Sequence, residues 1–118
     1  MAGFASSPVM VRQGITSSNS TDMIRHTVIF TLKQPGNAAV ETAFFDAARK
    51  LSAIAGVQHF ECLRQTSKKN NFDYGVSMEF DNSKIYEAYN QHPDHLAFIE
   101  KYWLKDVADF LEIDYEPL

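Results

Sequence analysis

The segment DYGVSMEF, residues 73–80, decides the fold because its apolar and polar residues alternate without interruption. Such alternation is typical of a β-strand with one covered and one uncovered side. A strand of this kind needs a second layer over its apolar side, so we expect helices to pack there. The apolar side consists of Tyr74, Val76, Met78 and Phe80.

Another strand is predicted directly before this one. Residues 57–65, VQHFECLRQ, are rich in strand-forming residues, and the polar run TSKKNN that follows is typical of a hairpin loop. Within this strand we place Phe60 and Cys62 on one side and Val57 and Leu63 on the other. The two strands are therefore expected to pair in an antiparallel hairpin.

A strand and a helix are predicted before the hairpin. Residues 23–33, MIRHTVIFTLK, alternate, and their apolar side includes His26. Asn37 is a suitable N-cap for a helix over residues 38–54, and Gly56 is a suitable end. The apolar stripe of this helix consists of Val40, Phe44, Ala47, Leu51 and Ile54.

Two helices and a last strand are predicted after the hairpin. The run Asp81-Asn82-Ser83 offers N-caps for a short helix, and Pro93 suits the first position of a second helix over residues 93–110. Residues 111–118, LEIDYEPL, are expected to form the last strand. The inward residues of the two helices are predicted to be Ile85, Ala88, Tyr89, His92, Leu96, Ile99 and Trp103.

The resulting order, β-α-β-β-α-β, predicts an α+β fold with a ferredoxin-like, four-stranded antiparallel sheet and helices on one face only. The uncovered face would then be too apolar to remain in water. We therefore expect a homodimer that pairs through this sheet face. On the predicted strand phases the face carries Thr27, Ile29, Thr31, Phe60, Cys62, Ser77 and Phe110.

Composition limits the partners and the compartment. The 118 residues carry a net charge of −4 with no basic stripe, so we expect no nucleic acid partner. Apolar runs fall well short of the roughly 20 residues that span a bilayer, so we expect no membrane partner. The single cysteine, Cys62, excludes a disulfide framework and fits a cytoplasmic location. We expect a flexible tail over residues 1–22 and one domain over residues 23–118.

The stretch YNQHPDHLAF, residues 89–98, contains the candidate chemistry, and three interpretations are open. In the first, His92 and Pro93 only begin a helix, and the imidazoles fill space. Alternatively, the positive end of that helix keeps His95 neutral, and a neutral imidazole can act as a base. The spacing HxxH could also supply two zinc ligands, but a third protein ligand is missing, so we expect no metal.

A pocket is the sharper interpretation. Tyr89 and His95 are predicted to meet over the first strand, where His26 projects from the apolar side, so the three could act as a catalytic group without a cofactor. The same three residues could instead form a buried polar network with no catalytic role. The predicted walls of the pocket are Val28, Phe30, Phe44, Phe45, Val76 and Trp103.

The segments MIRHTVIFTLK, YNQHPDHLAFIEKYW and DFLEIDYEP together resemble the stress-responsive A/B barrel (Dabb) domain family of dimeric α+β barrels. The resemblance covers about residues 23–118. It implies a ferredoxin-like protomer that pairs through its sheet, a homodimer with a possible small-molecule ligand and, for most members, no settled reaction.

A more distant similarity, to the plant polyketide cyclase olivetolic acid cyclase, implies catalysis of an aldol cyclisation without a cofactor. By motif, it assigns the histidine to His95, the tyrosine to Tyr89 and a further pocket histidine to His26. The pockets differ at Tyr74, where the cyclase has an imidazole, and at Ala48, where it has a tyrosine. The resemblance therefore implies lyase-, cyclase- or isomerase-type acid/base chemistry on a small apolar carbonyl compound, without naming a substrate.

Overall fold

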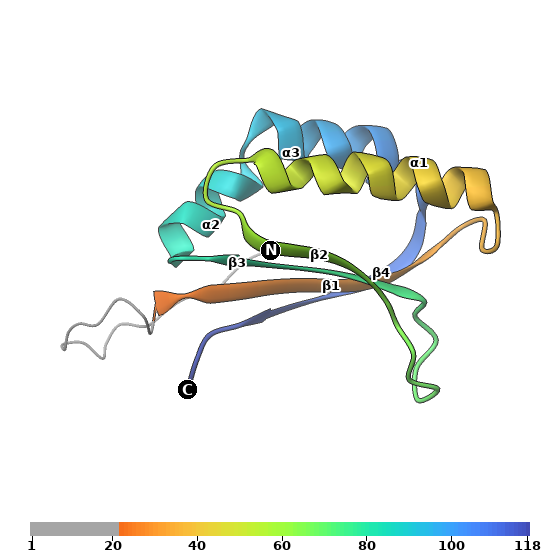
Figure 1. The fold of residues 1–118 in the computed structure, drawn as a ribbon, viewed down its shortest axis with the longest axis horizontal. Coiled ribbons are helices and arrows are strands. Elements are labelled where there is room, and N and C mark those ends of the chain that lie inside the picture. Colours follow the sequence, from red (N-terminus) through yellow and green to blue (C-terminus); the bar gives the residue numbers. More distant parts are fainter. Residues whose placement is uncertain (1–21) are drawn as a thin grey trace.

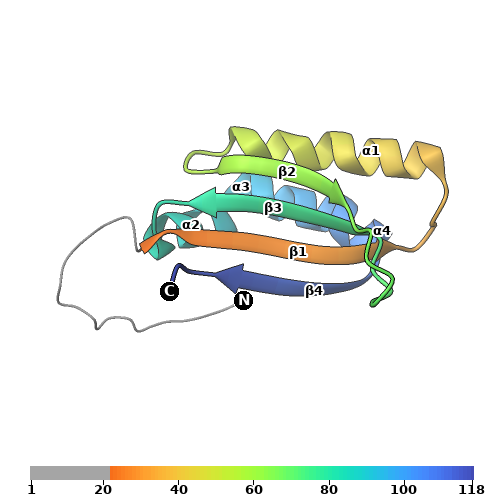
Figure 2. The ribbon, with the colours of Figure 1, turned by 60° about the horizontal axis from the view of Figure 1, so that its bottom comes forward.

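The computed structural model describes residues 22–118, so the tail predicted over residues 1–22 lies outside the described residues except for Asp22. The four strands form one antiparallel sheet in the order β2-β3-β1-β4 (Figure 2). The ferredoxin-like prediction is confirmed. In chain order, the elements are β1 (Ile24–Leu32), α1 (Ala38–Arg49), η2 (Lys50–Ala53), β2 (Gln58–Arg64), β3 (Tyr74–Phe80), α2 (Ser83–Asn90), α3 (Pro93–Phe98), η3 (Ile99–Trp103), α4 (Leu104–Asp106) and β4 (Val107–Tyr115).

All the helices lie on one face of the sheet (Figure 1). α1 and α3 run across that face, α2 lies at one end, and the opposite face is uncovered. η2 continues α1 as a 3₁₀ turn, whereas η3 and α4 continue α3, first as a π-helical turn. None of the helices within residues 22–118 is long and apolar enough to cross a membrane.

The predicted helix signals act at both ends of the helical layer. The side chains of Asn37 and Asn82 accept hydrogen bonds from the backbone N–H of Val40 and Ile85, which satisfies otherwise unpaired N–H groups in the first turn. Gly56 lies at φ +92°, and a Cβ there would come within 2.3 Å of the Ile85 side chain. Glycine is therefore required at this turn for both backbone conformation and space.

The core lies between the sheet and the helices. Cross-strand register places Val28 opposite Val76 and Phe30 opposite Tyr74, so these side chains share the helix-covered face. Phe30 and Phe44 are fully buried, and their ring centroids lie 5.5 Å apart. This face of β1 and β3 is the one that the sequence pattern predicted.

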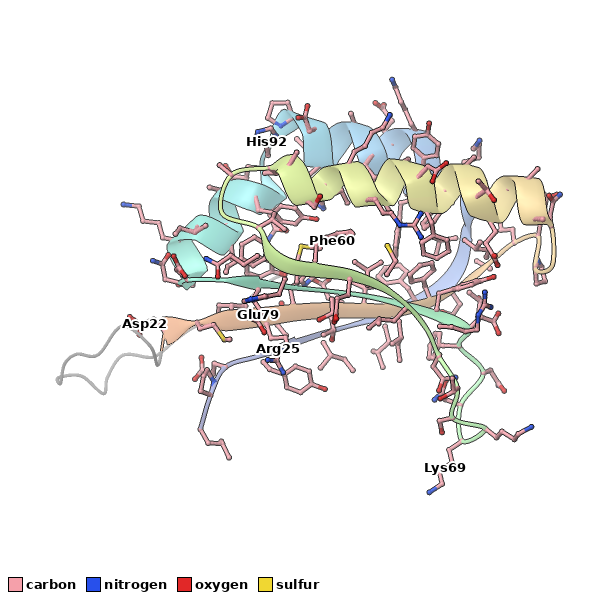
Figure 3. The ribbon with its side chains drawn as sticks, in the orientation of Figure 1. Asp22, Arg25, Phe60, Lys69, Glu79 and His92 are labelled. Carbon is pink, nitrogen blue, oxygen red and sulfur yellow. The ribbon has the colours of Figure 1, made fainter. Side chains whose placement is uncertain are left out.

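The side assigned to Phe60 and Cys62 was wrong. Cys62 pairs with Val76 and therefore faces the helices, and Figure 3 places Phe60 between the sheet and the helical layer. A bulge explains why Val57 also packs against the core: His59 has a φ of +52°, and the ladder shifts register between Gln58 and Glu61. The extra residue breaks the alternation on which the prediction relied.

The end of the helix predicted over residues 93–110 was also wrong. The helix ends at Asp106, and residues 107–110 begin β4 rather than extend the helix. Phe110 pairs with Phe30 and therefore lies on the helix-covered face, not on the uncovered one. Leu96 is 54% exposed, and Phe98 is buried in its place.

The uncovered face differs in membership from the prediction but not in character. Thr27, Ile29, Thr31 and Ser77 lie there as predicted, and register adds residues from β2 and β4. Several of the added side chains are apolar and about half exposed. They are Leu63, Leu111 and Tyr115, together with the half-buried Ile113.

Candidate functional site

A cavity of about 370 Å³ lies between the helix-covered face of the sheet and the helices. Its volume falls at the lower end of the roughly 300–1,000 Å³ of small-molecule pockets. Four of the six predicted wall residues line it: Val28, Phe44, Val76 and Trp103. Phe30 and Phe45 do not line the cavity and belong to the buried core.

Tyr89 and His95 meet at the wall of this cavity, with ring centroids 4.5 Å apart. The start of α3 sets their arrangement. Pro93 is the first helical residue, and the Nδ1 atom of its N-cap, His92, accepts a hydrogen bond of 3.0 Å from the Asp94 N–H. His95 then projects from the first turn towards Tyr89, which is 2% exposed on α2.

The hydrogen bonds of the pair leave a base and a donor available. Nδ1 of His95 lies 3.1 Å from the Asn90 carbonyl oxygen, which can only accept, so this nitrogen carries the proton. Nε2 therefore keeps its lone pair. Among the described residues, no group forms a hydrogen bond with the Tyr89 hydroxyl. The pair can thus offer an imidazole acceptor and a phenolic donor to a bound molecule.

Burial shifts the pKa values of Tyr89 and His95 in opposite directions, and both shifts favour the neutral forms. It lowers the pKa of His95, because charging a buried imidazole is unfavourable, and the hydrogen bond from Nδ1 to Asn90 only partly opposes this. Burial also raises the pKa of Tyr89, and the negative charge of Glu112 adds to the effect. Near neutral pH the site therefore holds a neutral imidazole beside a protonated phenol.

His26 lines the same cavity but belongs to a second polar group, which we call the His26 cluster: His26, Tyr86, Glu112 and Asp114. Nδ1 of His26 lies 2.7 Å from Asp114 Oδ1. The Tyr86 hydroxyl lies 2.9 Å from Asp114 Oδ2 and 3.0 Å from both Glu112 Oε2 and His26 Nδ1. Burial, then the charges of Asp114 and Glu112, raise the pKa of Tyr86.

The structure therefore places the predicted trio in two neighbouring groups. The His26 and Tyr89 rings are 6.4 Å apart at their centroids, farther than the Tyr89–His95 pair. Sequence reasoning missed Tyr86, Glu112 and Asp114. One signal was available: the two carboxylates alternate along β4 and face β1 in register, with Asp114 opposite His26.

The His26 cluster is also where a metal could be held among the described residues. Ligand atoms of His26, Glu112 and Asp114 all lie within 4.8 Å of one another, and a nitrogen with two carboxylates is a possible donor set. The Tyr86 hydroxyl already contacts all three. His92 and His95, by contrast, direct Nδ1 to different backbone groups, so the HxxH spacing does not create a joint site through these atoms.

Comparisons with known proteins agree with this fold. Residues 24–117 match the family described as Stress responsive A/B Barrel Domain. A Dabb family protein with a ferredoxin-like fold from Mesorhizobium loti is 54% identical, with a TM-score of 0.78, over 81% of this chain and 97% of that one. No curated protein matches significantly.

Two more distant solved structures share the fold. A dimeric ferredoxin-like protein of unknown function from Thermobifida fusca is 23% identical, with a TM-score of 0.68, over 80% of this chain and 91% of that one. The hydroxynitrile lyase from Passiflora edulis is 12% identical, with a TM-score of 0.74, over 83% of this chain and 95% of that one. At these identities the likeness concerns the architecture alone.

Proposed function

The chain belongs to the stress-responsive A/B barrel domain family, and we propose that it binds a small, largely apolar carbonyl compound and transfers a proton to or from it without a cofactor. The observation that carries the proposal is the Tyr89–His95 contact at the wall of an apolar cavity. A neutral base next to a protonated donor is the pairing that enolate chemistry requires.

In the proposed reaction, Nε2 of His95 takes a proton from the carbon next to the carbonyl group. The Tyr89 hydroxyl donates a hydrogen bond to the carbonyl oxygen. This hydrogen bond becomes stronger as negative charge develops on the oxygen. His26, held by Asp114, orients the bound molecule from the first strand. The predicted catalytic roles of His95, Tyr89 and His26 remain part of this proposal.

The proton transfer is common to lyase, cyclase and isomerase outcomes, so it can be tested before the substrate is known. The Passiflora edulis neighbour is described as a hydroxynitrile lyase. Its low identity gives no support to that particular reaction here. The first experiment should therefore measure proton exchange rather than any one product.

Exchange of the hydrogens next to the carbonyl group of heptan-2-one for deuterium, followed by NMR in D₂O, makes that measurement. The wild-type protein should accelerate exchange, and His95→Gln and Tyr89→Phe should each lower the catalysed rate by about 10²-fold or more. His59→Gln is the control, because that side chain is 74% exposed and does not line the cavity. Wild-type exchange at the buffer rate, or unchanged exchange in both site variants, would refute the proposal.

A non-catalytic role is the second candidate, and the His26 cluster favours it. Its hydroxyl, imidazole and carboxylates are hydrogen-bonded to one another, and they tie α2 to β1 and β4. Such a network stabilises a fold whether or not a ligand binds. This role would be supported if the protein neither bound the ketone nor accelerated its deuterium exchange, while substitutions in the His26 cluster still lowered the stability of the fold.

We also propose that the protein is a homodimer joined through the uncovered sheet face. Leu63, Leu111 and Tyr115 are 47–53% exposed there, and neighbours of the same fold are described as dimeric. Leu111→Glu should convert the dimer to a monomer in sedimentation velocity, because a buried unpaired carboxylate is costly. Leu96→Glu is the matched control on α3, and an unchanged dimer in Leu111→Glu would exclude this interface.

A further inference from the structure

The cavity has a marked charge asymmetry. Among the described residues that line it, none is a lysine or an arginine, and Glu112 is its only carboxylate. His95 does not compensate, because burial lowers its pKa and favours the neutral ring. His26 lies against the carboxylate of Asp114. A bound anion would therefore meet negative charge with no free cation to pair with it.

Glu112 is fixed in position at this wall. Its Oε2 accepts a hydrogen bond of 3.0 Å from Tyr86 and lies 3.5 Å from Nδ1 of His26. The side chain is 26% exposed. Within residues 22–118, no group donates a hydrogen bond to its other oxygen, Oε1. The carboxylate is thus held by one oxygen and has acceptor capacity left on the other.

We propose that Glu112 sets the class of ligand: the cavity takes neutral molecules with an apolar body and an N–H or O–H donor beside the carbonyl, and it rejects carboxylates. The donor bonds to Glu112, while Tyr89 binds the carbonyl oxygen. A carboxylate ligand loses its water without gaining a cationic partner and faces a like charge. The inference rests on the ligand cavity of the proposed function and narrows its substrates.

Three probes with the same pentyl–carbonyl body test this directly: hexanamide, heptan-2-one and hexanoate. They differ only in the last group, which is a neutral donor, a methyl group or an anionic oxygen. Trp103 is the only tryptophan in the sequence and lines the cavity, so its fluorescence reports binding. At pH 7.5, hexanamide should bind most tightly, and hexanoate should bind about tenfold or more weakly than heptan-2-one.

Glu112→Gln should remove the discrimination. Hexanoate should gain about tenfold in affinity, because the like charge is gone, while hexanamide should change less than about threefold, because the amide oxygen of glutamine still accepts. Glu87→Gln makes the same change on α2, away from the cavity lining, and should alter neither affinity. Melting curves establish that both variants are folded.

The outcomes separate this inference from the function on which it rests. If the wild type binds hexanoate as tightly as heptan-2-one, the role of Glu112 is refuted while the carbonyl site stands. If both neutral probes bind and Glu112→Gln leaves the hexanoate affinity unchanged, the discrimination has another origin and the inference is again refuted. If none of the three probes binds, the inference and the proposed cavity function are both refuted.

Discussion

Tyr86 and Tyr89 lie three positions apart on α2, and their hydroxyl groups have opposite surroundings. Three polar side chains of the His26 cluster lie within 3.0 Å of the Tyr86 hydroxyl. The Tyr89 hydroxyl has no hydrogen-bond partner among the described residues, although it is more deeply buried. One helix therefore presents a satisfied phenol and an available one to the same side of the sheet.

This difference teaches how to separate stability from function in a small domain. A buried polar group that is bonded to its neighbours contributes to folding, and removing one member leaves the others unsatisfied. A buried polar group without a protein partner contributes nothing of that kind. Because such groups are rare away from sites, the Tyr89–His95 pair is the better candidate for contact with a ligand.

The largest expected effect on stability comes from breaking the His26 cluster at its imidazole. His26→Gln should lower the free energy of unfolding by about 2 kcal/mol, since the partly buried carboxylate of Asp114 loses its closest donor. His59→Gln is the matched control, because His59 also lies 2.8 Å from a carboxylate but its side chain is 74% exposed, against 8% for His26. Its removal should have little effect. Equal losses in urea unfolding would show that burial does not distinguish the two pairs.

A smaller effect should follow from removing one hydroxyl at a time from α2. Tyr86→Phe should lower the free energy of unfolding by about 1 kcal/mol, because Glu112 and Asp114 lose the half-buried hydroxyl donor that they share. Tyr89→Phe should leave the unfolding midpoint nearly unchanged, because none of the described residues loses a hydrogen bond when this hydroxyl is removed. Urea unfolding of the two variants, which remove the same atom, makes the comparison. A loss in Tyr89→Phe as large as that in Tyr86→Phe would place Tyr89 in a structural network.

The sequence predicts most of this architecture because the fold follows from alternation and caps. The strand pattern of Tyr74 to Phe80, the Asn37 and Asn82 caps and the Pro93 helix start are local signals, and each is found where predicted. The failures have local causes that alternation cannot reveal. A bulge at His59 and a π-helical turn over residues 99–103 each insert a residue into a regular pattern.

The candidate site was harder to predict from the sequence, because it depends on the register between strands that are distant along the chain. Tyr89 and His95 were recognisable, since they flank one turn and lie six residues apart. Asp114 is 88 residues from His26, and only the pairing of β1 with β4 brings them to 2.7 Å. The predicted last strand began at residue 111 rather than 107 but already contained Asp114. The pairing was missed because the sequence does not reveal the register of this strand against the first one.

The smallest expected effect concerns the charge state of His95. It tests whether the Tyr89–His95 pair is free to act on a ligand, in contrast to the hydrogen-bonded His26 cluster. An ordinary imidazole has a pKa of about 6.5, and burial lowers the pKa of His95. A base must be neutral, so activity should rise with pH through the lowered pKa and already exceed half its maximum at pH 6.5. The pH profile of kcat/KM for the exchange reaction measures this directly. An acid limb centred at or above pH 6.5 would mean that a neighbouring group stabilises the protonated form of His95, and that His95 belongs to a hydrogen-bonded network.

A substitution next to the site sharpens this last measurement. The protonated form of His92 repels positive charge on His95 and so contributes to lowering the pKa of His95. Replacing His92 by a residue that cannot be protonated should therefore move the acid limb slightly upward. His92→Asn is the suitable change, because asparagine is a good N-cap and preserves the hydrogen bond to the Asp94 N–H. A downward shift would contradict the assigned electrostatics. The plateau of the profile separates a charge effect from disruption of the helix start. A frayed helix would expose His95 to water, which also raises its pKa but lowers the rate at every pH, whereas loss of the His92 charge should leave the high-pH rate unchanged.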